Sequence, residues 1–376
     1  MNQTYRILPV YTSDVSGVCS ALFELGGLVV MHDPSGCNST YNTHDEIRWY
    51  DYDSLIFISA LTEQDAVNGN DKKLVNDILE AAEEFRPEFI AVTNSPIPYI
   101  NGTDFSALMR IIEKKTGIPS FYVPANGMHD YTAGAGRALE RVALRLVDGH
   151  FSRPVPKTVN ILGATPLDYA AKGNISSIRA VLENAGYKVN SVWAMDDSLD
   201  NIRRAGEASV NLIISSCGLL PARILRGRFG TPYTAGTPAG KFTEILIREL
   251  DRSEKTGECI TAYNSVPQAN ADVSVALIGD PVVMGSLAAA IRISRGIKTR
   301  VFCPTETTGN LLGKNDIRVH GEEETEVALR DTAAVIADPL YRLICPDNAR
   351  FYPLPTLALS GRIYLKQAKI LSQLEV

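Results

Sequence analysis

The chain has 376 residues, 45% hydrophobic and 21% charged, which is enough apolar material for two or three buried cores and too much for a disordered protein. The formal net charge is −6 and no tract of Lys and Arg offers a track for phosphates, so nucleic acid is not expected as a partner. The longest apolar stretches fall short of the roughly 18–20 residues of a membrane span, and the N-terminal residues lack a secretory pattern. We therefore expect a cytoplasmic chain without membrane contact.

Units of strand, loop and helix are predicted to repeat along the chain. Short apolar runs with polar ends are typical of strands covered on both faces, as in parallel sheets, and a Gly followed by Pro is a usual helix stop. The expected strands are residues 26–30, 89–95, 121–124, 159–163, 211–217, 273–279 and 333–338. The expected helices are residues 104–115, 132–141, 176–184, 221–229 and 284–294. The spacing predicts three similar α/β domains, residues 1–155, 156–267 and 268–376.

A candidate site follows the first predicted strand, in the run Met31-His-Asp-Pro-Ser-Gly-Cys37. A strand that ends in Pro-Ser-Gly-Cys brings a thiol to the carboxyl edge of a sheet, where α/β proteins bind ligands. Gly36 lets a ligand or another backbone approach Cys37 closely. Reactive side chains also end three other predicted strands, namely Ser95, Cys217 and Asp280.

Six cysteines are scattered along the chain without a C-x-x-C pair. This pattern argues against a zinc knuckle and, in a reducing compartment, against a disulfide framework. Metal ligands would therefore have to converge from distant segments or from two chains. The chain also lacks G-x-G-x-x-G and G-x-x-x-x-G-K-[ST], so it is not expected to bind NAD or to hydrolyse ATP itself.

His129 lies in the loop that precedes the Gly-rich helix predicted at residues 132–141. A histidine in such a loop can donate a proton. It can equally cap the helix or bond a backbone carbonyl, and the sequence leaves both interpretations open.

Five segments, in order along the chain, resemble motifs of the nitrogenase component 1 family. Met31–Cys37 is similar to its His-Gly-Pro-x-Gly-Cys motif, and Leu61–Leu74 to its Thr-Asp-x-x-Asp-x-Val-Phe-Gly-Gly-x-x-Lys-Leu run. The other three segments are Thr93–Asp104, Pro124–Leu139, and Arg228–Tyr233 with Thr237–Gly240. Members of this family include dinitrogenase subunits, cofactor scaffold proteins, dark protochlorophyllide reductases and the reductive cyclase of F430 synthesis.

The resemblance implies three Rossmann-like α/β domains with parallel sheets. It implies the catalytic component of a two-component reductase, which takes low-potential electrons from an ATP-dependent iron protein through an iron–sulfur cluster. A small-molecule substrate would then occupy the cleft between the domains. Two alternatives remain: a non-catalytic scaffold for cofactor assembly, and a module that binds a metal chelate or tetrapyrrole.

The same resemblance implies a set of site residues. Cys37 matches the second of three family cysteines, and Ser95 stands at the third position. The first position falls near Asp14, with Cys19 farther along the first helix, so either Cys19 or the Asp14 oxygens would complete the set. Cys37 and Cys19 from two chains, a second copy or a paralogous subunit, would hold one shared [4Fe–4S] cluster.

The remaining expected roles concern the cofactor surroundings and protons. Gly36 and Ser95 are expected to contact the cofactor. His129 and Asp33 are expected to supply protons to the substrate. An eight-iron cluster or an iron–molybdenum cofactor is not expected from so few thiols.

Overall fold

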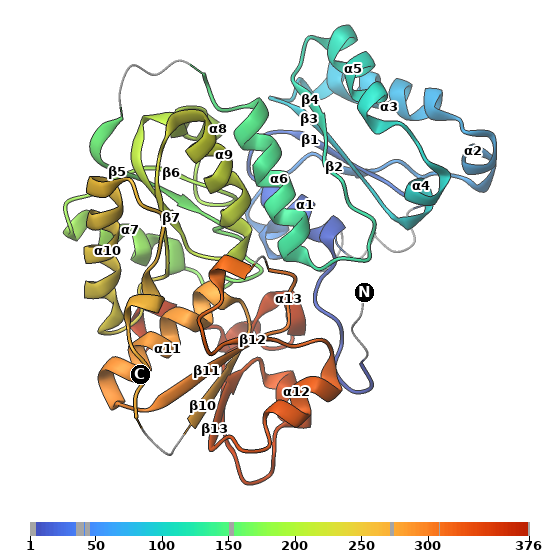
Figure 1. Cartoon of the computed structure of the whole chain (residues 1–376). Coiled ribbons are helices and arrows are strands. Elements are labelled where there is room, and N and C mark those ends of the chain that lie inside the picture. Colours follow the sequence, from blue (N-terminus) through green and yellow to red (C-terminus); the bar gives the residue numbers. More distant parts are fainter. Residues whose placement is uncertain are drawn as a thin grey trace.

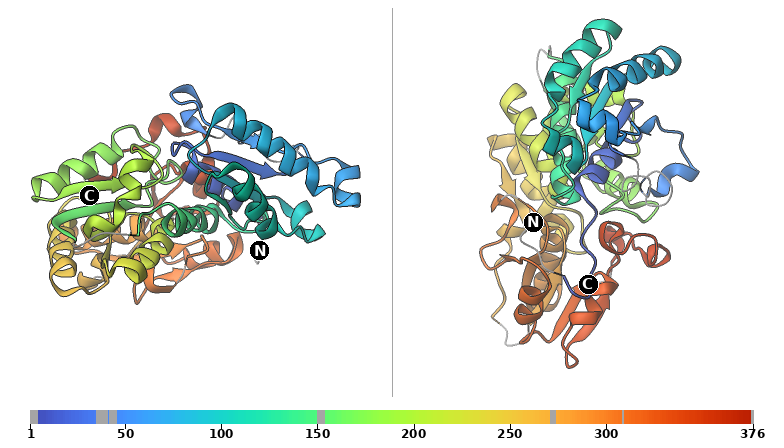
Figure 2. Two further views of the ribbon diagram at one scale, coloured as in Figure 1. Left: turned by 90° about the horizontal axis from the view of Figure 1, so that it is seen from above. Right: turned by 90° about the vertical axis from the view of Figure 1, so that its right-hand side faces the viewer.

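The computed structural model describes residues 5–34, 41, 46–149, 154–270, 274–307 and 309–374. Three parallel sheets follow one another along the chain, each flanked by helices (Figure 1). The left-hand view of Figure 2 shows the first sheet standing to one side of the other two. Within the described ranges, no helix is both long and apolar enough to cross a membrane.

The first sheet has the order β2-β1-β3-β4. Its strands are β1 (Leu28–His32), β2 (Ile56–Ile58), β3 (Ile90–Asn94) and β4 (Ser120–Tyr122). Its helices are α1 (Asp14–Leu22), α2 (Glu63–Asn68), α3 (Asp71–Phe85), α4 (Pro96–Asn101), α5 (Phe105–Thr116) and α6 (Tyr131–Arg145). Leu28, Val30 and Val92 pack with α3 and α5 on one face, whereas Val29 and Ala91 belong to the core shared with α1 and α6.

The second sheet has the order β6-β5-β7-β8-β9 and the third the order β12-β11-β10-β13-β14. The second comprises β5 (Val155–Leu162), β6 (Lys188–Val192), β7 (Ala208–Ile213), β8 (Tyr233–Ala235) and β9 (Ile260–Thr261), with α7 (Asn174–Asn184), α8 (Leu199–Arg203), α9 (Leu219–Phe229) and α10 (Phe242–Thr256). The third comprises β10 (Ser274–Ile278), β11 (Lys298–Cys303), β12 (Ile317–Arg318), β13 (Ala334–Ala337) and β14 (Arg350–Pro353), with α11 (Pro281–Arg295), α12 (Glu322–Ala328) and α13 (Leu357–Ser360).

Short 3₁₀ turns link these elements. They are η2 (Ile47–Tyr50), η3 (Ala205–Glu207), η4 (Ser216–Gly218), η5 (Ala262–Ser265), η6 (Gly309–Leu311), η7 (Pro339–Ile344), η8 (Leu365–Gln367) and η9 (Leu371–Gln373). Turn η4 shortens the strand predicted at residues 211–217, because the chain leaves the sheet after Ile213. The predicted α/β class with parallel sheets is confirmed, whereas the three domain boundaries stay predictions.

Helix α6 lies between the first sheet and the second (Figure 1) and crosses α1 at two glycines. A Cβ added to Gly134 would lie 1.9 Å from the backbone oxygen of Asp14, and one added to Gly17 would lie 2.4 Å from that of Tyr131. The two backbones therefore touch, which only glycine permits. This close crossing fixes the N-terminus of α1 against the loop that begins α6.

Candidate functional site

The carboxyl ends of β1 and β3 lie side by side at one edge of the first sheet. The strands pair in parallel, with Met31 beside Thr93 and His32 beside Asn94. The backbone N–H of Ser95 donates to the carbonyl of His32 at 3.2 Å. The structure thus brings the turn after β1, which contains Asp33, next to Ser95.

Two hydroxyl groups at this edge are buried without a hydrogen-bond partner among the described residues. They belong to Thr93, on β3, and Ser95, which precedes α4, and their side chains are 0% and 2% exposed. The odd-numbered residues of β3 face α1 and α6, the same side as Met31. Because an unsatisfied buried polar group costs about 1–3 kcal/mol, these hydroxyls are candidates for contact with a group that the described residues do not supply.

Asp14, the first residue of α1, is the reverse case, because its buried carboxylate already accepts three backbone hydrogen bonds. It accepts hydrogen bonds from the backbone N–H groups of Asn126 at 3.0 Å, Gly127 at 2.8 Å and Val15 at 2.9 Å. Burial raises the pKa of this carboxyl, and the three backbone donors oppose that rise. Asp14 anchors the loop before α6, and its role as a metal ligand stays a prediction that would require breaking these bonds.

Cys19 lies in the middle of α1 with a side chain that is 0% exposed. Burial, together with the nearby Glu46 carboxylate, raises the pKa of this thiol far above its ordinary value. Since metal ligation requires the thiolate, this environment favours a core thiol. The ligand role of Cys19 therefore stays a prediction with no support from its surroundings. Gly36 and Cys37 lie outside the described residues, and their roles stay predictions.

His129 links the first domain to the third through a hydrogen bond to Glu306. Its Nδ1 lies 2.7 Å from Oε2 of Glu306, in the loop after β11, and its backbone oxygen accepts from Asp14 N–H at 2.9 Å. The helix cap is instead Asp130, which accepts from Thr132 N–H at 2.9 Å. The histidine is partly exposed and oriented by a carboxylate, an arrangement compatible with proton transfer. No sequence signal pointed to Glu306, because it lies 177 positions away.

Asp33 is buried at the turn after β1. Its backbone N–H donates to Ser59 Oγ at 3.2 Å, and its carbonyl accepts from Leu61 N–H at 2.9 Å. These contacts fix the turn against the neighbouring strand β2. The expected proton-donor role of Asp33 stays a prediction.

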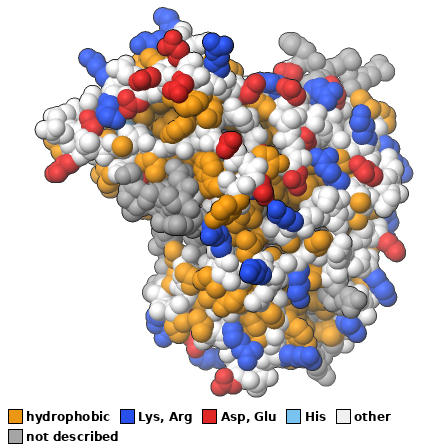
Figure 3. Space-filling view, turned by 180° about the vertical axis from the view of Figure 1, so that it is seen from behind, with side chains coloured by type: hydrophobic (Ala, Val, Ile, Leu, Met, Phe, Trp, Pro, Cys, Tyr) orange, Lys and Arg blue, Asp and Glu red, His pale blue; other side chains and the backbone are white. Residues whose placement is uncertain are grey.

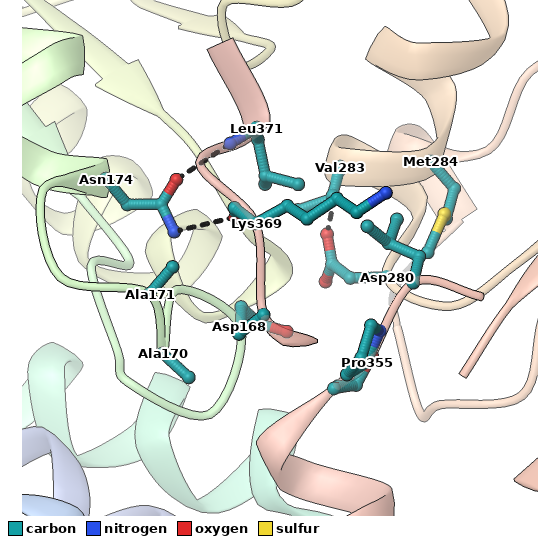
Figure 4. A pocket seen from close by; sticks show the side chains of 13 residues that line it. Asp168, Ala170, Ala171, Asn174, Asp280, Val283, Met284, Pro355, Lys369 and Leu371 are labelled. Carbon is teal, nitrogen blue, oxygen red and sulfur yellow. Dashed lines mark hydrogen bonds between the residues drawn. The ribbon is translucent and has the colours of Figure 1, made fainter. Parts of the chain in front are cut away.

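A second group of polar side chains lies where the three domains meet (Figure 4). Tyr131 of α6 donates to Asp168 Oδ1 at 2.6 Å, and Ser216 N–H donates to Asp280 Oδ2 at 2.9 Å. Asp280 also caps α11, accepting from Val282 N–H at 2.9 Å and Val283 N–H at 3.2 Å. Burial raises the pKa of both carboxyls, and the nearby Asp280 charge raises that of Asp168 further.

The space left at this junction is small. The cavity that Asp168 and Asp280 line measures about 20 Å³, room for one water molecule. The C-terminal segment closes one side, since Leu371 N–H donates to Asn174 Oδ1 at 2.9 Å (Figure 4). In this conformation the junction has no room for a substrate.

Seen from behind, hydrophobic side chains gather over the middle of the molecule (Figure 3).

The described residues fit an iron–sulfur cluster only in part. Among them, no three His, Cys, Asp or Glu side chains come close enough together to hold a metal ion. Cys19 is buried in the core, and the Asp14 carboxylate already accepts backbone hydrogen bonds. The Ser95 hydroxyl has no partner among the described residues, so it remains as a possible oxygen ligand. A complete ligand set would need Cys37 and a second chain.

Comparisons with known proteins agree with this architecture. The family model described as nitrogenase component 1 type oxidoreductase matches residues 16–303. A solved structure titled "Nitrogenase Cp1 at pH 5" has a TM-score of 0.65 and 16% sequence identity, and the match covers 96% of this chain and 87% of that one. This likeness supports the expected fold of three Rossmann-like domains.

Curated relatives have different roles. The nitrogenase molybdenum-iron protein alpha chain of Methanosarcina barkeri is 26% identical over 196 residues, 50% of this chain and 36% of that protein. A light-independent protochlorophyllide reductase subunit of Synechococcus sp. (strain JA-3-3Ab) is 25% identical over 239 residues, covering 59% and 46%. The nitrogenase iron-molybdenum cofactor biosynthesis protein NifE of Klebsiella pneumoniae is 24% identical over 234 residues, covering 59% and 51%.

This chain thus spans between about a third and a half of the length of these relatives. Their names include both reductases and a biosynthesis protein, so they do not decide between catalysis and cofactor assembly. The family itself is decided, because its model covers most of the chain and the fold agrees. The chain belongs to the nitrogenase component 1 type oxidoreductase family.

Proposed function

We propose that this chain is the catalytic component of a nitrogenase-like reductase, which receives low-potential electrons from an ATP-dependent iron protein through an iron–sulfur cluster. The observation that carries the proposal is the pair of buried hydroxyls of Thr93 and Ser95, which have no hydrogen-bond partner in the described part of the chain. They lie at the sheet edge from which the chain continues into the run that contains Cys37. An edge with unused donors is where a bound group would repay the cost of burial.

Cys37 and Ser95 are the residues that would hold the cluster from this chain, and a second copy or a paralogous subunit would supply the other ligands. A bound cluster supplies one-electron transfer at low potential. Asp14 would act indirectly, because its carboxylate fixes the loop of Asn126 and Gly127 beside the edge. Cys19 would contribute packing on the inner side of α1.

Proton delivery would fall to His129 and Asp33. The Glu306 carboxylate holds His129 through Nδ1, and Nε2, for which no partner is found among the described residues, would pass a proton to a substrate. Asp33 lies on the turn that leads toward Cys37. The substrate would require the junction of the three domains to open, since its cavity of about 20 Å³ admits only water.

The first test is the iron and acid-labile sulfide content of protein purified without oxygen, with electron paramagnetic resonance after dithionite reduction. We expect about four irons per two chains, lost in Cys37→Ala and reduced in Ser95→Ala. The matched control is Cys259→Ala, which removes an exposed cysteine of the second domain and should keep the iron. An iron-free wild type after anaerobic reconstitution would contradict the proposal, as would full iron in Cys37→Ala.

A scaffold for cofactor assembly is the second candidate, and the filled junction favours it. The two functions differ in what happens after reduction. A catalytic component keeps its iron through repeated cycles with an iron protein and ATP and reduces a substrate. A scaffold instead loses its cluster to an apo-protein acceptor, which an iron assay of the separated proteins would detect.

A further inference from the structure

The small cavity at the domain junction is walled by three parts of the chain. The second domain contributes Asn174, the third contributes Asp280 and Met284, and the C-terminal segment contributes Lys369 and Leu371. In Figure 4 the C-terminal segment passes between Asn174 and Asp280. The cavity is therefore closed in part by a stretch of chain that follows the last strand, β14, and the last α-helix, α13.

This stretch, residues 361–374, is here called the C-terminal lid. It consists of the short turns η8 and η9 with irregular backbone between them. Its backbone hydrogen bonds are local, such as Gln367 N–H to the Tyr364 carbonyl at 2.8 Å and Ala368 N–H to the Leu365 carbonyl at 3.0 Å. Segments held by local turns with little buried area open at a lower free energy than helices and strands of a core.

The lid is attached at one place, on the first two turns of α7. Asn174 accepts from Leu371 N–H at 2.9 Å and donates through Nδ2 to the Lys369 carbonyl at 3.4 Å, so one amide binds both strands of the turn (Figure 4). The hydroxyls of Ser177 and Ser372 are also in hydrogen-bond contact. Leu371 is 5% exposed and is the one residue of the lid that is buried.

The second and third domains are joined more firmly below the lid. Ser216 N–H donates to Asp280 at 2.9 Å, and Thr237 N–H donates to the Ser286 hydroxyl, also at 2.9 Å. All four of these residues are buried, so separating the domains would expose buried polar groups without partners. Release of the lid breaks bonds at the surface instead, and it uncovers the same cavity.

We propose that the C-terminal lid opens by itself, with the three domains still joined, and that this movement admits a substrate to the junction. Asn174 holds the lid closed, and Leu371 is its apolar anchor. The part of the proposal that concerns a substrate rests on the proposed function, whereas the movement of the lid does not.

The test measures access to Met284, which lines the cavity and is 3% exposed. Hydrogen peroxide is the probe, because it is small and converts methionine to its sulfoxide, which mass spectrometry of the digested full chain locates. When opening and closing are fast, the rate of modification follows the fraction of open molecules. We expect Met284 to be oxidised faster than Met109, which is equally buried in the core of the first domain.

One variant loosens the lid. Asn174→Ala removes the two bonds to the lid and should raise the oxidation rate of Met284 by about tenfold. The matched control is Asn184→Ala at the other end of α7, where the side chain is exposed, and it should change the rate by less than about twofold. A rate at Met109 that rises as much as that at Met284 would indicate general unfolding and would overturn the proposal.

A second variant locks the lid. Ser177→Cys with Ser372→Cys replaces two hydroxyls in contact, which brings the Cβ atoms near the separation of about 3.5–4.5 Å that a disulfide requires. We expect the oxidised protein to protect Met284 by at least about tenfold and the reduced protein to return to the wild-type rate. Ser177→Cys alone is the control and should not respond to reduction. Equal rates at Met284 in the locked and reduced protein would overturn the proposal.

The outcome is separate from the iron assay, because Met284 can be followed in protein without iron. A lid that opens in a chain that never takes up iron would support the movement and contradict the reductase function. Iron in wild type, together with a Met284 that the lock does not protect, would overturn the lid and leave the reductase function standing.

Discussion

The carboxyl edge of the first sheet and the junction of the three domains both contain buried polar groups. The two regions differ in whether those groups have hydrogen-bond partners. At the junction, Asp280 receives three backbone N–H donors and Asp168 receives the Tyr131 hydroxyl. At the edge, the hydroxyls of Thr93 and Ser95 have no partner among the described residues.

The difference indicates which region is structural and which is open to a ligand. Saturated buried groups stabilise the fold that contains them, whereas unsatisfied ones lower its stability until something binds. In this family member the junction holds the domains together in the described conformation, and the edge has buried hydroxyls that the described residues leave without a partner. Substitutions in the two regions should therefore change stability in opposite directions.

The largest effect is expected from Asp280→Ala at the junction. The change removes the cap of α11 and leaves Ser216, Val282 and Val283 N–H groups without their acceptor. We expect a loss of about 3–4 kcal/mol in the free energy of unfolding, measured by urea denaturation. The control Asp280→Asn keeps one acceptor oxygen and should lose less. A stability of Asp280→Ala equal to wild type would contradict the structural role of the junction.

The second effect is a dependence on pH at the edge, through His32. Its pKa is about 4 in the folded chain and 6.5 when unperturbed, so the unfolded state binds the proton more tightly. The contribution to stability is therefore present above about pH 6.5 and is lost as the pH falls toward about 4, by about 3 kcal/mol in total. Urea denaturation at several pH values should show a shallower loss in His32→Gln. An identical slope in both proteins would refute the assignment.

The sequence predicted the fold better than it predicted which candidate site residues are buried or already hydrogen-bonded. Apolar runs such as residues 273–279 indicated strands because burial on both faces selects such residues locally. Glycines such as Gly117 and Gly296 indicated helix ends, and both adopt positive φ there, at 72° and 64°. These signals depend only on neighbours in the chain.

The site depends instead on contacts between distant segments. Asp14 was a candidate ligand because its position matches a family motif, but its donors Asn126 and Gly127 lie 112 and 113 positions away. Cys19 was a candidate because it is a thiol, and only the rotation of α1 against the core reveals its burial. The sequence indicated which residues are candidates for the site, whereas it could not show which of them are buried or already have hydrogen-bond partners.

The third prediction concerns Asp14, whose carboxylate accepts three backbone hydrogen bonds near the carboxyl edge of the first sheet. Asp14→Ala should lower the free energy of unfolding by about 2 kcal/mol, because it leaves the buried N–H groups of Asn126 and Gly127 without an acceptor. Asp14→Asn keeps an acceptor and should recover part of this loss. Iron content that falls in Asp14→Asn while its stability stays near wild type would instead support ligation by the carboxylate.

The smallest expected effect, and the one of opposite sign, comes from Thr93→Val. Valine has nearly the same shape as threonine, and Thr93 is 0% exposed with a hydroxyl that no described residue satisfies. Removing an unsatisfied buried hydroxyl should leave the iron-free chain as stable as wild type or more stable by up to about 1 kcal/mol. Val92→Thr, which adds a hydroxyl to the fully buried opposite face of β3, is the control and should destabilise. A clear loss of stability in Thr93→Val would mean that its hydroxyl is already satisfied, and the edge would then be as complete as the junction.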